Sequence, residues 1–142
     1  MSGIRVNNGA KKIQVNDSGD YIVLNFGDHS FPERFFSMTD RVLALAAGAE
    51  PREKAIRAEH PDGSRELVRA LTGLDLEIHR QISAEVDGLF GAGTCQKVFG
   101  DIVPGIELFD EFFTQLIPYF QEYWAQRAQR LDKYSAERTG NV

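Results

Sequence analysis

A run of apolar residues in the middle of the chain constrains the fold most, because it fixes the period of a long helix. Apolar side chains recur there every three or four positions, at Leu67, Leu71, Leu74, Ile78, Ile82, Val86 and Leu89. This spacing places them on one face of an amphipathic α-helix, and that face should contact the core. Ser64 is expected to begin the helix, which is predicted over residues 64–90. Gly73 within it suggests a close helix crossing or a bend.

Two other segments have helical spacing. Over residues 30–48, Phe and aliphatic side chains recur at helical intervals, and Ser30 stands three residues before Glu33, as in a capping box. A further helix, predicted over residues 102–134, is rich in aromatic residues and contains Pro118. Because proline lacks a backbone donor, we expect a kink or break near this position.

Residues that disfavour helix lie between and after these segments. Residues 49–63 are charged and include Pro51, Pro61 and Gly63, so they are predicted to be a loop that can hold a short helical turn. Residues 135–142 are predicted to be a frayed tail.

The first part of the chain, residues 4–26, has the pattern of short strands. Its β-branched and aromatic runs are separated by clusters of Asn, Asp and Gly, which favour tight hairpin turns. We predict a β-hairpin or three-stranded meander that must lie against helices or another chain, because so small a sheet is marginally stable alone. The whole chain, residues 1–142, is predicted to be a single, mostly helical α+β domain in which three to four helices follow the strands.

The net charge of the chain and the lengths of its apolar stretches limit the classes of partner that it can bind. With 21 acidic and 16 basic residues, the chain has a formal net charge of −5 and gains no general attraction to nucleic-acid phosphates. No stretch reaches the ~20 apolar residues that a membrane span needs, and the first residues lack the apolar core of a secretory signal. We therefore expect neither a nucleic-acid nor a membrane partner and predict a cytosolic protein.

The residue types that commonly act in catalysis or bind metals do not have the spacing that those roles require. His29, His60 and His79 do not form the close pairs of a zinc site, and Cys95 is interpreted as a buried structural cysteine. The acidic residues Glu107, Asp110 and Glu111 are explained by the dipole of a helix that begins near them. We predict no catalytic residue, no metal site and no cofactor, and therefore not an enzyme.

The aromatic residues of the last helix are the candidate partner-binding site. They cover more than one helical face, whereas a core stripe is confined to one. We predict that the group contacts a partner or a second copy of the chain, through Phe109, Phe112, Phe113, Phe120, Tyr123 and Trp124. Core packing remains the alternative for each single Phe.

Residues 86–100, followed by residues 107–113, resemble a family of small proteins of tailed phages and prophages, the tail assembly chaperones. The likeness lies in the turn Phe90-Gly91-Ala92-Gly93-Thr94, the following Lys97-Val98-Phe99-Gly100, the helix rich in Phe and Glu, and the end Tyr134-Ser135 with Arg138. It covers roughly residues 80–138. Within it, Gly91, Gly93 and Gly100 are expected to form a structural turn.

The resemblance implies a protein that binds other proteins in the host cytoplasm. Its partners would be the tape-measure protein and the tail-tube protein, which it would hold during tail assembly. Two alternatives stay open. The chain could be a structural minor tail or connector protein of the virion, or an enzyme whose type the sequence does not reveal.

Overall fold

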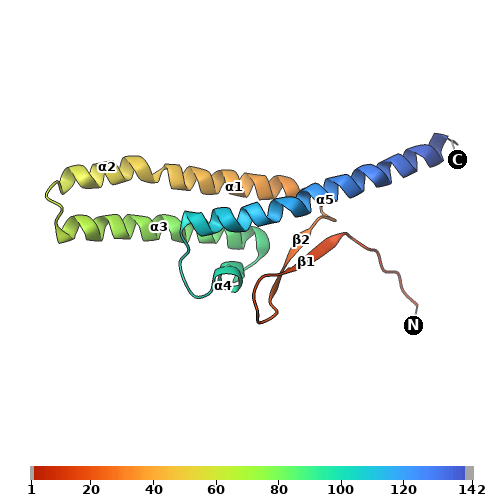
Figure 1. The fold of residues 1–142 in the computed structure, drawn as a ribbon, viewed down its shortest axis with the longest axis horizontal. Coiled ribbons are helices and arrows are strands. Elements are labelled where there is room, and N and C mark those ends of the chain that lie inside the picture. The colour runs from red at the N-terminus through yellow and green to blue at the C-terminus, as the bar shows by residue number, and fades with distance from the viewer. Residues whose placement is uncertain (1, 140–142) are drawn as a thin grey trace. The chain divides into compact units, whose positions relative to one another are not determined.

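The computed structural model describes residues 2–139, and within them the chain is a mostly helical α+β fold, as predicted. An N-terminal antiparallel hairpin precedes the helices (Figure 1). The chain divides into two compact units, one ending at Leu108 and the other beginning at Phe109. Whether it unfolds as the single domain expected from the sequence stays a prediction, because compactness does not measure cooperativity.

The hairpin is formed by β1 (Ala10–Gln14) and β2 (Tyr21–Asn25), which pair from Ala10 opposite Asn25 to Gln14 opposite Tyr21. In β2, buried Ile22 and Leu24 alternate with exposed residues, so one face of the hairpin belongs to the core. Of the two forms predicted, the hairpin is therefore the one found. Among the described residues, the N-terminal segment at 4–6 forms no strand.

Two helices, α1 (Phe31–Ala47) and α2 (Ala49–Glu59), follow the hairpin almost end to end (Figure 1). Helix α2 corrects the prediction of a loop over residues 49–63. Pro51 lies in its first turn, where a missing backbone donor costs no helical hydrogen bond. Ion pairs one turn apart, Glu50 with Lys54 at 3.3 Å and Glu53 with Arg57 at 3.0 Å, further support the helix.

The two serines expected to begin helices behave differently. Ser64 caps α3 (Arg65–Phe90), because its side chain accepts a hydrogen bond from the backbone N–H of Leu67. Ser30 occupies the N-cap position of α1, but its side chain makes no cap hydrogen bond, so the expected capping box is wrong. Its hydroxyl instead donates to Asp28 at 2.7 Å, and this bond and the one from the Ser30 backbone hold the pKa of Asp28 below its usual range.

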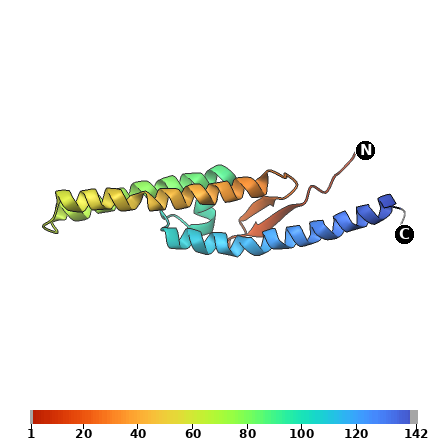
Figure 2. The same cartoon turned by 90° about the horizontal axis from the view of Figure 1, so that it is seen from above.

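Helix α3 runs beside α1 and α2 and carries the core face predicted for it (Figures 1 and 2). Its buried residues are Leu67, Leu74, Ile78, Ile82 and Val86. Ion pairs join it to the neighbouring helices, Arg41 with Glu85 at 2.8 Å and Arg52 with Glu77 at 2.7 Å. A close helix crossing at Gly73 is not found, since a Cβ there would meet nothing within 4 Å.

A cluster of phenylalanine rings joins the hairpin, α1 and α3 at one end of the first unit. The Phe31 ring packs edge-to-face on Phe26 at 5.9 Å and on Phe90 at 6.2 Å between ring centroids. Phe35 contacts Phe90 in the same way at 6.4 Å. Full burial of one such ring contributes about 1.5–3 kcal/mol, so this cluster is a large part of what fixes the hairpin on the helices.

After α3 come the short helix α4 (Thr94–Phe99) and the long helix α5 (Ile106–Thr139). Helix α5 passes through Pro118 without a break and continues past residue 134. Of the kink or break expected near Pro118, the break is therefore not found, and the frayed tail expected from residue 135 is not found up to residue 139. Pro118 leaves the carbonyl of Thr114 without its helical donor. Because both residues are exposed, water can satisfy that carbonyl. Residues 140–142 of the expected tail lie outside the described residues.

Candidate protein-binding site

The six aromatic residues predicted to bind a partner fall into two groups on α5. Phe109, Phe112, Phe120 and Tyr123 are buried, and Phe113 is half-buried. Trp124 is 57% exposed, and its ring meets that of Tyr123 edge-to-face at 5.4 Å. The structure therefore makes Trp124 the accessible member of the predicted site, while the buried residues serve packing in this conformation of the chain.

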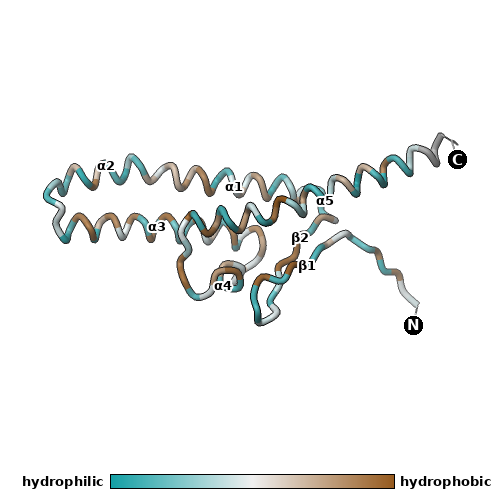
Figure 3. Tube along the Cα trace, in the orientation of Figure 1, coloured by the Kyte–Doolittle hydropathy of each residue, from teal (hydrophilic) through white to brown (hydrophobic). Residues whose placement is uncertain are grey.

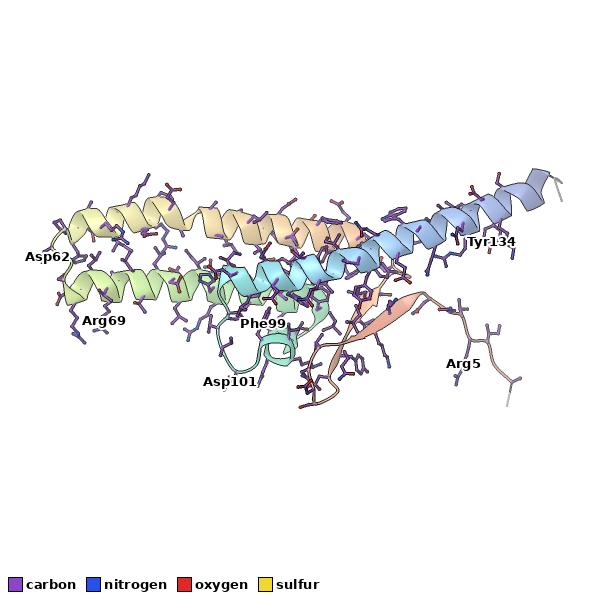
Figure 4. All side chains as sticks on the ribbon, in the orientation of Figure 1. Arg5, Asp62, Arg69, Phe99, Asp101 and Tyr134 are labelled. Atoms are coloured by element: carbon purple, nitrogen blue, oxygen red, sulfur yellow. The ribbon has the colours of Figure 1, made fainter. Side chains whose placement is uncertain are left out.

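Two apolar residues beyond Trp124 extend the accessible surface, and sequence reasoning missed both. Leu131 is 51% exposed and Tyr134 is 60% exposed. They lie two and nearly three turns after Trp124, a spacing that returns them to the same side of the helix (Figure 4 labels Tyr134). Their helical spacing from Trp124 is present in the sequence, but this part of α5 is mostly hydrophilic, so the spacing was overlooked (Figure 3).

The acidic residues at the start of α5 are all exposed. Glu107 lies in the first turn of the helix, and Asp110 and Glu111 follow it. Negative charge near a helix N-terminus interacts favourably with the helix dipole, which accounts for their position without chemistry.

The glycine turn between α3 and α4 has the backbone expected of it. Gly91, Gly93 and Gly100 have φ values of 118°, 82° and 87°, a region that other residues rarely adopt. Gly91 ends α3 and Gly93 precedes α4, while Gly100 ends α4. The turn therefore needs glycine for its conformation.

Asp87 and Thr94 hold this turn together from either side. The Asp87 carboxylate accepts a hydrogen bond from the backbone N–H of Cys95 at 2.9 Å, and the Asp87 carbonyl accepts one from Gly91 at 2.8 Å. The Thr94 hydroxyl, which is buried, donates to the Gly91 carbonyl at 2.7 Å. These bonds end one helix and begin the next within a few residues.

Cys95 is buried, as predicted. Burial raises the pKa of its thiol to about 12, and the neighbouring Asp87 carboxylate adds to the rise. Since the thiolate is the reactive form of cysteine, this side chain is unreactive near neutral pH.

The structure does not bring the histidines together. His79 is held on its own helix, where its Nδ1 lies 2.8 Å from the backbone carbonyl of Asp75 and 3.3 Å from its carboxylate. His29 is exposed in the loop before α1, and His60 ends α2. Over residues 2–139 no three His, Cys, Asp or Glu side chains gather as a metal ion would require.

The described part of the first unit includes the following two hollows. One, of about 470 Å³, runs between α3 and the α1–α2 pair, where it is lined by buried Leu74 and Ile78, the Glu53–Arg57 ion pair, and the neighbouring side chains of Asp75 and His79. The other, of about 320 Å³, lies between β2 and the glycine turn. Asn16 closes the hairpin loop beside it by donating to the Lys97 carbonyl at 3.0 Å.

Comparisons of the chain with protein-family models, with curated proteins and with solved structures found no match. None of the helices in the described part of the chain is both long enough and apolar enough to cross a membrane.

Proposed function

We propose that this protein is a tail assembly chaperone that binds the tape-measure protein and tail-tube subunits in the host cytoplasm during tail assembly. The observation that carries the proposal is the accessible apolar surface of α5. Trp124, Leu131 and Tyr134 are each more than half exposed on one helix, and exposed aromatic residues of this kind are enriched where proteins anchor a partner.

The resemblance of residues 86–100 to tail assembly chaperones supports the same function. The residues that carry it form the helix end, turn and short helix built around Asp87, Gly91 and Thr94. We assign the turn a structural role, since it is built from positive-φ glycines and hydrogen bonds to the backbone rather than from exposed reactive groups. The resemblance in this turn therefore supports a fold shared with tail assembly chaperones, and the proposed binding surface lies on α5.

A structural minor tail or connector protein of the virion is the alternative, because such a protein also needs accessible aromatic residues. Purified phage particles distinguish the two. Mass spectrometry should detect no copy of this chain in finished virions if it is a chaperone, whereas a stoichiometric amount in the particles would establish the structural role.

Co-expression with the tape-measure protein of the same phage tests the chaperone function itself. A long helical client with exposed apolar residues aggregates when it is made alone, and a chaperone keeps it soluble by covering those residues. We expect most of the client in the soluble fraction when this chain is present, and in the pellet when it is absent. A client that is equally insoluble in both cultures would contradict the proposal.

A further inference from the structure

We propose that residues 124–135 of α5 are a docking face for an acidic amphipathic helix of a partner protein. The inference rests on the proposed function and adds to it the position of the surface and the charge of the segment that binds there.

The geometry of the helix places three apolar side chains and the basic side chain of Arg127 along one side of α5. Arg127 follows Trp124 by one turn and precedes Leu131 by one turn, so all three lie along one side of α5. Tyr134 continues this side, one turn beyond Leu131. From residue 128 to residue 135 every side chain is exposed, so the described part of this chain leaves the surface open.

The charge of this segment is opposite to that of the chain. Residues 124–135 contain Arg127, Arg130 and Lys133 but a single acidic residue, Asp132, while the whole chain has a net charge of −5. A local excess of basic residues on an acidic protein attracts an acidic partner and orients it, because interfaces are arranged so that opposite potentials meet.

The same charges favour a protein over a nucleic acid or a membrane. A surface built for phosphate gains affinity from the positive charge of the whole domain, and here the rest of the chain repels phosphate groups and anionic lipids. A helix that lies in a membrane surface also needs a broad apolar face. Three large apolar side chains over about three turns make a narrower strip, which fits the groove of a partner helix.

The side chain of Trp124 is preorganised for contact with a partner helix. Its ring rests edge-to-face on that of Tyr123, which is buried and therefore fixed in position. A side chain already held in place loses less conformational freedom on binding, so it contributes more to affinity.

A synthetic peptide pair tests the inference on the full-length protein. The probe is a fluorescein-labelled helix of about three heptads with Leu along one face and Glu along both flanks, and its control has Lys in place of Glu. Binding is measured by fluorescence anisotropy. Trp124, the only tryptophan of the chain, reports contact directly through a shift of its emission to shorter wavelength. We expect the Glu peptide to bind and the Lys peptide not to bind.

Charge reversal locates the binding on α5. The double variant Arg127→Glu/Arg130→Glu should weaken binding of the Glu peptide by about tenfold or more. The matched control, Arg65→Glu/Arg69→Glu on exposed positions of α3, makes the same change of net charge and should weaken it by less than about threefold. Leu131→Ala/Tyr134→Ala should also weaken binding, with an unchanged melting temperature because both side chains are exposed.

The inference is overturned if the two peptides bind equally, if neither binds, or if both charge reversals have the same effect. Phosphatidylserine vesicles and duplex DNA serve as competing probes, and binding to either of these in place of the Glu peptide would also overturn it. Its failure is separable from failure of the proposed function. A chain that keeps the tape-measure protein soluble but does not bind the Glu peptide is a chaperone with another docking face. A chain that binds the Glu peptide but does not keep the tape-measure protein soluble has the docking face without the chaperone function.

Discussion

The carboxylate of Asp87 in α3 accepts a hydrogen bond of 2.9 Å from the backbone N–H of Cys95 in α4. Because the carbonyl of the same residue accepts the N–H of Gly91, Asp87 both ends one helix and begins the next. The helix end, glycine turn and short helix are thus organised around one residue, whose side chain and backbone carbonyl both accept hydrogen bonds from the backbone.

Removal of the Asp87 carboxylate, which accepts the N–H of Cys95 at the start of α4, should destabilise the protein. Asp87→Ala should lower the free energy of unfolding by about 1 kcal/mol, while Asp87→Asn, which keeps a side-chain acceptor, should lose less. Urea unfolding measures both, with Asp40→Ala on the exposed side of α1 as the control. Equal stability of the Asp87→Ala and Asp40→Ala variants would show that the hydrogen bond contributes nothing.

The thiol of Cys95 gives a prediction for alkaline pH. Its pKa is raised from an ordinary value of 9.0 to about 12 in the folded chain, chiefly by burial. Between these values the unfolded chain ionises its thiol and the folded chain does not, so stability is full below pH 9 and falls as pH rises toward 12. Cys95→Ala should show a smaller fall over this range. Parallel pH profiles for the two proteins would contradict the prediction.

The glycine turn should not tolerate side chains. Gly91→Ala and Gly93→Ala force a residue with a Cβ into positive φ, and each should lower the free energy of unfolding by about 1 kcal/mol or more. Gly73→Ala is the matched control, since Gly73 lies within α3 with open space around its Cβ position. There alanine should stabilise the helix by about 0.5–1 kcal/mol. Loss of stability at all three positions would mean that φ does not explain the effect.

The sequence predicted the fold best where one physical signal dominated. The apolar spacing from Leu67 to Val86 identified the core face of α3, and Ser64 identified its beginning. The prediction from sequence failed over residues 49–63, where Pro51 was interpreted as a helix breaker. Proline breaks a helix in the interior but not in the first turn, and the pattern does not reveal which of these positions it will occupy.

The candidate site could be predicted only in part, for a related reason. The spacing of the aromatic residues of α5 indicated a large apolar surface but could not separate buried Phe112 from exposed Trp124, because burial depends on contacts outside the helix. Leu131 and Tyr134 both lie within the helix predicted over residues 102–134, but they were missed as part of the site because polar residues separate them from each other and from Trp124. The structure shows that both are exposed on the helix that also carries Trp124.

The central claim is that α5 binds a client protein through its exposed side chains, and one paired measurement tests it. The tape-measure protein of the same phage is co-expressed with Trp124→Ala and with Phe112→Ala, and both the soluble client and the melting temperature of each variant are measured. Trp124→Ala should keep its melting temperature and lose most of the soluble client, since an exposed anchor contributes about 2 kcal/mol or more to binding alone. Phe112→Ala should melt earlier, since it removes a buried ring. If Trp124→Ala retains full solubilisation, and client is lost only with variants that are themselves unfolded, then α5 serves as core and the claim is contradicted.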